Sequence, residues 1–164
     1  MITEYLVSQP ALKVGQITRS GEKTEAAQSA AESAFGRACI RSTAEGYVEH
    51  PSGTAGDFCG VPVFEHIMPD SSVTLDIAAE ANFTMMRKGR INIYCEAAVV
   101  RGGPLFYRHA NAGAAPEALG AFRGDNDGGS GDVTELTSGF YIHSASTADD
   151  GGGFKAEVEF NLPV

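Results

Sequence analysis

Apolar and polar residues alternate over nine consecutive positions near the end of the chain, the pattern of a β-strand with one buried face. We expect the inward side chains of this strand to be Phe154, Ala156, Val158, Phe160 and Leu162. Residues 90–100 alternate in the same way and predict a second strand. The sequence Arg101-Gly102-Gly103-Pro104 is typical of a turn, so residues 105–108 are expected to pair back on the second strand as a hairpin.

Shorter segments with a period of two predict further strands at 38–41, 47–50, 58–64, 73–77 and 140–142. Residues 21–35 differ, because their alanines are three and four positions apart and predict the only helix. A face made of alanine alone anchors a helix weakly, so a loop with a single helical turn is the alternative. Short strands separated by Gly and Pro turns predict an all-β fold, either a single β-barrel or a jelly-roll-like sandwich.

The beginning of the chain predicts an extended N-terminal arm at residues 1–19, followed by a β-rich domain at 20–164. Pro10 disfavours helix in the residue before it, and Leu12, Val14 and Ile17 are spaced for an extended segment with one adhesive face. The candidate contact residues of the arm are Leu6, Val7, Leu12 and Val14. We expect this arm to dock on another protein.

Charge and cysteine content restrict the partners and the compartment. The net charge is −9, which disfavours binding to nucleic acid and to anionic membranes. Three cysteines without a C-x-x-C pair, and an N-terminus without a secretory signal, predict reduced, buried thiols in a protein that folds in the cytoplasm. One basic cluster stands out, Arg87, Lys88 and Arg90, and it is either a contact for an acidic partner or a turn with solvated charges.

Candidate catalytic and metal-binding residues do not form a recognisable pattern. The histidines His50, His66, His109 and His143 are too scattered to predict a metal site. The acidic residues of 125–135 resemble calcium ligands in type, but not in the spacing of an EF-hand, so we expect a polar turn. No nucleophile or phosphate-binding motif is present. We therefore expect no enzymatic activity and no cofactor.

Several short motifs, taken in order, resemble the structural cement (capsid decoration) proteins of tailed bacteriophages. They are Gln9-Pro10-Ala11, Val14-Gly15-Gln16-Ile17, Phe35-Gly36-Arg37-Ala38, Arg87-Lys88-Gly89-Arg90-Ile91, Gly103-Pro104-Leu105-Phe106-Tyr107-Arg108, Gly120-Ala121-Phe122-Arg123 and Asn161-Leu162-Pro163. The resemblance implies a non-enzymatic β-rich protein that assembles in the host bacterial cytoplasm and stabilises the head. It would lie on the outer surface of the virion and bridge subunits of the major capsid protein as a homo-oligomer, a dimer or a trimer.

Two other classes of protein remain as alternatives. A carbohydrate-binding β-sandwich, such as a phage tail or receptor module, would stack sugars on exposed aromatic side chains. The chain contains no Trp but has five Tyr residues. A cupin-like β-barrel enzyme would require a metal held by clustered histidines, which the sequence does not group.

Overall fold

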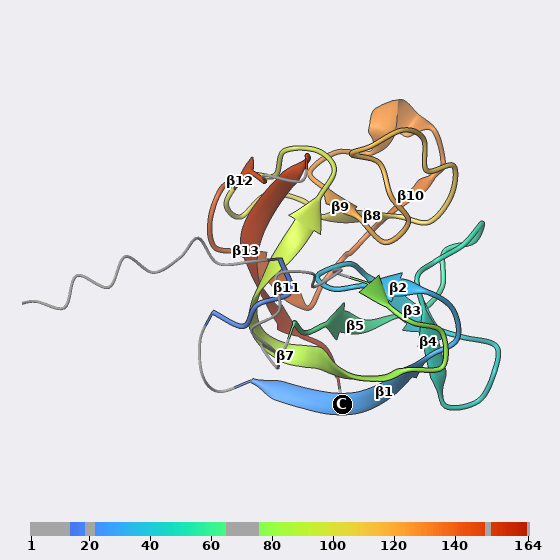
Figure 1. The fold of residues 1–164 in the computed structure, drawn as a ribbon. Coiled ribbons are helices and arrows are strands. Elements are labelled where there is room, and N and C mark those ends of the chain that lie inside the picture. Colours follow the sequence, from blue (N-terminus) through green and yellow to red (C-terminus); the bar gives the residue numbers. More distant parts are fainter. Residues whose placement is uncertain (1–13, 19–21, 65–75, 150–151, 164) are drawn as a thin grey trace, which may run out of the picture.

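The computed structural model describes residues 14–18, 22–64, 76–149 and 152–163. These residues form thirteen β-strands and one short 3-10 helix, η1 (Asp127–Gly129), so the all-β fold is confirmed (Figure 1). In the part described, no helix has the length and apolar character needed to cross a membrane.

Five strands form a closed barrel, which confirms the barrel alternative. They are β1 (Lys23–Ser29), β3 (Cys39–Arg41), β4 (Tyr47–Glu49), β5 (Phe58–Pro62) and β7 (Asn82–Cys95). The strands pair in the order β1-β4-β3-β5-β7, and β1 then pairs with β7, which closes the barrel. The β1–β4 pair is parallel and the other four pairs are antiparallel.

The remaining strands extend this sheet or lie beside it. They are β2 (Ser33–Ala34), β6 (Asp76–Ile77), β8 (Phe106–Arg108), β9 (Phe122–Arg123), β10 (Val133–Glu135), β11 (Phe140–Ile142), β12 (Thr147–Ala148) and β13 (Phe154–Asn161). Strands β2 and β6 pair only with each other within the described residues. The other six belong to the same eleven-stranded sheet as the barrel.

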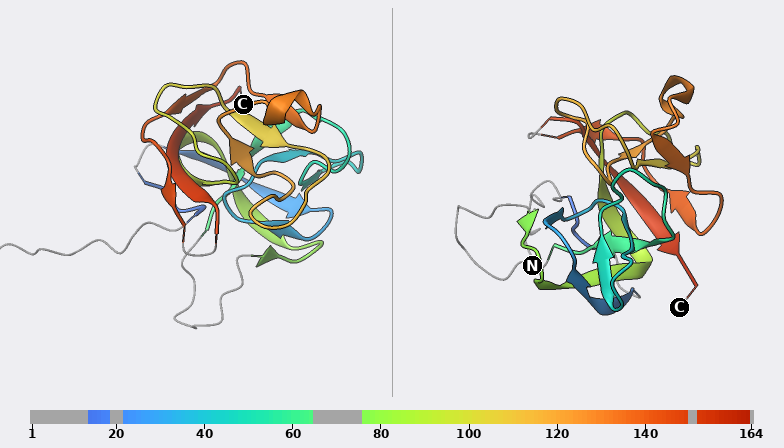
Figure 2. Two further views of the ribbon diagram at one scale, coloured as in Figure 1. Left: turned by 90° about the horizontal axis from the view of Figure 1, so that it is seen from above. Right: turned by 90° about the vertical axis from the view of Figure 1, so that its right-hand side faces the viewer.

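Strand β7 connects the barrel to the rest of the molecule. Its first half, residues 82–88, pairs with β1, and its second half, residues 88–95, pairs with β13. Figures 1 and 2 show β7 and β13 running from the barrel toward the part that contains β8, β9 and β10. A single long strand therefore belongs to both halves of the structure.

Two hydrophobic cores lie on opposite sides of the central strands. The smaller core is inside the barrel and contains Cys39, Val48, Cys59 and Met85. The larger core includes Met86, the residue after Met85, because neighbouring side chains on a strand point to opposite faces. Its other members include the buried side chains of β13 and of β8 and β9.

The end of the predicted arm is attached to this body. The Gly15 amide donates to the Asn92 carbonyl at 2.6 Å, and the Asn92 amide donates to the Gln16 carbonyl at 3.0 Å. Gly36 permits this close approach, because a Cβ there would lie 2.2 Å from Cγ1 of Val14. Its φ of +72° also favours glycine. Residues 14–18 are therefore fixed against β7.

Most strand predictions are confirmed, including the terminal strand, in which Ala156, Val158 and Phe160 are fully or almost fully buried. Of the strand predicted at 73–77, residues 73–75 lie outside the described residues. The predicted helix at 21–35 is wrong: residues 23–29 are β1, whose backbone pairs with β4 and β7. An alanine-only face buries too little apolar surface to stabilise a helix against this pairing. The predicted hairpin is also wrong, because β8 pairs with β9 and β10 instead of β7.

Candidate interaction site

The basic cluster lies in the middle of β7 instead of in a turn, and two of its three charges are already paired. Nη1 of Arg87 lies 3.3 Å from Oε2 of Glu25, and Nε of Arg90 lies 2.9 Å from Oε2 of Glu159. Hydrogen bonds from His143 and Arg90 hold the pKa of Glu159 below its usual range. Lys88 is exposed. The cluster is thus not one basic patch, and the interpretation as a turn is wrong.

The apolar residues predicted for the arm fall into two groups. Leu6, Val7 and Leu12 lie outside the described residues. Val14 is described and is only 4% exposed, so its side chain contributes to the core and offers almost no surface to a partner. The structure therefore corrects this part of the predicted contact set: Val14 anchors the base of the arm.

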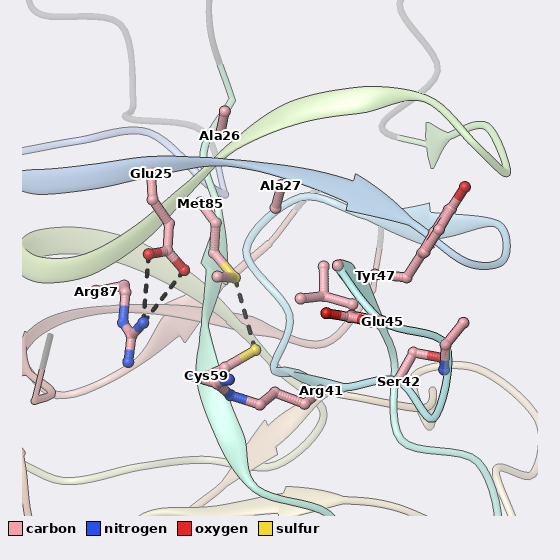
Figure 3. A pocket seen from close by; sticks show the side chains of 13 residues that line it. Glu25, Ala26, Ala27, Arg41, Ser42, Glu45, Tyr47, Cys59, Met85 and Arg87 are labelled. Carbon is pink, nitrogen blue, oxygen red and sulfur yellow. Dashed lines mark hydrogen bonds and ion pairs between the residues drawn. The ribbon is translucent and has the colours of Figure 1, made fainter.

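The open end of the barrel forms a pocket of about 430 Å³ (Figure 3). Each of the five barrel strands contributes to its lining, with Ala27, Arg41, Tyr47, Cys59 and Met85 as representatives. Five strands can line one cavity only if it is the interior of the barrel. The pocket is therefore an extension of the smaller core toward solvent.

Sulfur atoms form part of the floor of this pocket, and charged groups lie on its rim. Sγ of Cys59 lies 3.8 Å from Sδ of Met85. Burial raises the pKa of Cys59 to about 11, although the nearby guanidinium groups of Arg87 and Arg41 oppose this rise. The thiol is neutral at pH 7 and acts as an apolar surface. The floor is therefore suited to an apolar group and not to nucleophilic chemistry.

Of the four histidines, His66 lies outside the described residues, Nδ1 of His109 is buried without a hydrogen-bond partner, and His50 is held by backbone hydrogen bonds. His50 accepts a hydrogen bond from the Ala34 amide at Nε2, and its Nδ1 lies 2.7 Å from the Ala38 carbonyl oxygen. These two contacts require the neutral ring with its proton on Nδ1. Burial lowers the pKa of His50 to about 4. Within the described residues, no three His, Cys, Asp or Glu side chains are placed to hold a metal ion.

The acidic loop takes part in a buried ion-pair network that the sequence did not reveal. Glu96 and Arg108 are each 1% exposed at the side chain, and Nη2 of Arg108 lies 2.8 Å from Oε1 of Glu96. Arg123 contacts the same Glu96 oxygen at 2.8 Å. Asp127 lies 2.9 Å from Arg108 and 2.7 Å from Arg123. Asp125 and Asp127 of this loop are thus held by arginines, whereas Asp132 accepts a hydrogen bond from Nδ2 of Asn111.

One signal in the sequence could have indicated this network. Arg108 and Arg123 each follow an apolar segment, Leu105-Phe106-Tyr107 and Gly120-Ala121-Phe122. A single arginine at the end of a buried strand needs a buried acid, because an unpaired charge is costly to desolvate. The partner Glu96 is close to neither arginine in sequence, so alternation alone could not identify it.

Comparison with known proteins gives one family and one fold. The sequence model of the structural cement protein family (E217 gp24/Pam3 gp6) matches residues 2–159. No curated protein matches the chain. The fold is similar to a chain in a solved structure titled "The capsid of Myoviridae Phage XM1", with a TM-score of 0.64 and 14% sequence identity over 98% of both chains.

The buried network predicts a large loss of stability on removal of its central charge. Glu96→Gln keeps the shape of the side chain but removes the fully buried carboxylate that two arginines share, and leaves only the more exposed Asp127 to bridge them. We expect the free energy of unfolding to fall by about 3 kcal/mol or more, measured by urea denaturation at pH 7. The control is Glu117→Gln, which alters a carboxylate 41% exposed and 3.8 Å from Arg108. It should cost at most about 1 kcal/mol. Equal losses would contradict the account.

The neutral ring of His50 predicts a loss of stability in mild acid. In the unfolded chain this residue binds a proton near pH 6.5, but in the folded chain only near pH 4. Lowering the pH through this window therefore favours unfolding, by up to about 3 kcal/mol in total. Urea denaturation at several pH values should show a smaller decrease in His50→Gln than in the wild type. The control His143→Gln should retain the decrease; a wild-type slope in His50→Gln would refute the assignment.

Proposed function

Because the chain belongs to the structural cement protein family, we propose that it binds the outer surface of a bacteriophage head and stabilises it. In this proposal it bridges neighbouring subunits of the major capsid protein and acts as a homo-oligomer, a dimer or a trimer. It assembles in the bacterial cytoplasm and remains on the virion. The match of the family over residues 2–159 is the observation that carries the proposal.

The structure supports a role in binding another protein more than a role in catalysis. The buried charged side chains, which the alternation of apolar and polar residues did not predict, pair with one another in the network around Glu96. Burial raises the pKa of the Cys59 thiol and lowers that of the His50 imidazole, so both are neutral at pH 7. Neutral groups held in fixed hydrogen bonds suit a rigid body that other proteins bind.

The energetic basis of the proposed stabilisation is linkage. A protein that binds only the assembled shell stabilises it by RT ln(1 + [L]/Kd), or about 2.7 kcal/mol per site when its concentration is 100 times Kd. A shell offers many equivalent sites, and an oligomer that spans two of them gains further from effective concentration. Modest affinity at each site is therefore sufficient.

The contact residues are proposed from the arm and from β7. Leu6, Val7 and Leu12 provide apolar side chains ahead of the point where residues 14–18 are fixed to β7. On β7, Lys88 provides an exposed charge, whereas Arg87 and Arg90 are engaged by carboxylates. Surface ion pairs contribute only about 0–1 kcal/mol each, so apolar contacts of the arm must supply most of the affinity.

Heat stability of phage heads tests the function. Purified protein added to heads that lack it should bind and raise the temperature at which they release DNA, measured with a dye that fluoresces on DNA. Bovine serum albumin at the same concentration is the control. Heads that neither bind the protein nor gain stability would contradict the proposal. They would favour a carbohydrate-binding module, for which Tyr141, 44% exposed, offers an aromatic surface.

Deletion of residues 1–10 tests the arm. The body should still fold, because the deletion keeps residues 14–18, which pair with β7, and both hydrophobic cores. Its far-ultraviolet circular dichroism should match that of the full chain. We expect binding to heads or self-association, measured by co-sedimentation and by analytical ultracentrifugation, to weaken at least tenfold. A deletion that unfolds the body would show that the segment is part of the fold. One that binds and associates normally would show that it is not a docking element.

A further inference from the structure

The mouth of the barrel has the shape of a socket. Its floor is made of apolar or neutral groups, among them Ala27, Val48, Cys59 and Met85, which also form the smaller core. Figure 3 shows the side chain of Ala27 pointing into the pocket. A volume of about 430 Å³ is enough for a large side chain of another protein.

The rim of this socket carries one unpaired charge of each sign. Arg41 and Glu45 are exposed, line the pocket and have no ion pair or side-chain hydrogen bond among the described residues. The other two rim charges, Glu25 and Arg87, pair with each other. In addition, Nε of Arg87 is buried without a hydrogen-bond partner. The rim thus offers a free cation and a free anion around an apolar floor.

We propose that the barrel mouth receives an apolar side chain of the major capsid protein, flanked in that partner by one acidic and one basic residue. The partner's acid would lie near Arg41 and its base near Glu45. An anchor side chain in a desolvated pocket with charges at the rim is the usual anatomy of a protein–protein hot spot. This inference rests on the proposed function and identifies a contact surface separate from the arm.

A symmetric second copy of the chain fits the socket poorly. Two-fold symmetry would place one concave mouth against another, and neither would supply a side chain to fill the other. A protruding segment of a different protein would fill the cavity and would pair with both charges of the rim.

Filling the socket from within provides the first test. Ala27→Phe should occupy the pocket and weaken binding to heads at least tenfold in a co-sedimentation assay. The matched control is Ala148→Phe, which adds the same ring at an exposed alanine of strand β12 that does not line the pocket. It should change the affinity less than threefold. Circular dichroism checks that both variants are folded. Equal affinity of folded Ala27→Phe and the wild type would overturn the inference.

The rim charges provide a second test that does not disturb the core. Arg41→Gln and Glu45→Gln should each weaken binding about threefold, and together about tenfold, because each removes one exposed ion pair. Arg101→Gln is the control, since Arg101 is another exposed arginine without an ion pair among the described residues. It should leave the affinity unchanged. If the double variant binds like this control, the inference is wrong even if the wild type binds heads.

A cross-link identifies the occupant. A benzophenone attached to Ser42→Cys on the rim should react with the capsid protein, and mass spectrometry should find an apolar residue between opposite charges in the cross-linked peptide. A cross-link only to a second copy of this chain would overturn the choice of partner. Failure of the unmodified wild type to bind heads at all would instead overturn the proposed function, and this inference with it.

Discussion

Backbone pairing along β7 is the constraint on which the rest of the structure depends. Over 82–88 it pairs with β1, which closes the barrel, and over 88–95 it pairs with β13, which carries the larger core. Gly89 lies where one partner gives way to the other; its φ is +129°, and a Cβ there would lie 2.8 Å from Cβ of Glu22. Because one strand belongs to both cores, we expect the barrel and the larger sheet to unfold together.

The pairing along β7 also determines which groups each end of the molecule exposes to a partner. The barrel strands lie toward the beginning of β7, and the loop with η1, which the Glu96 network holds in place, lies toward its end (Figure 1). Most arginines that the structure describes are engaged by carboxylates or by an aromatic ring. A partner therefore finds few free arginines. Under the proposed function, its affinity must come mainly from shape and from repeated contacts at many equivalent sites.

The sequence predicted those parts of the fold that local pattern determines. Strand β13 alternates strictly because one face covers the core, and its buried residues could be named from the sequence. Strand β1 was missed because its alanines are spaced as on one face of a helix, whereas its structure is decided by pairing with β4 and β7. The partners of β8 and the carboxylate beside Arg108 depend on residues distant in sequence, which periodicity does not encode. The barrel mouth was missed for the same reason, since five separate strands build it.

The central claim is that this β-rich body binds the outer surface of a phage head and bridges its subunits. Electron cryomicroscopy of heads incubated with the purified protein tests it most directly. The account predicts ordered density for the barrel and the β13 sheet on the outside of the shell, in contact with two neighbouring capsid subunits. Undecorated heads under saturating protein, or density in contact with a single subunit only, would contradict it.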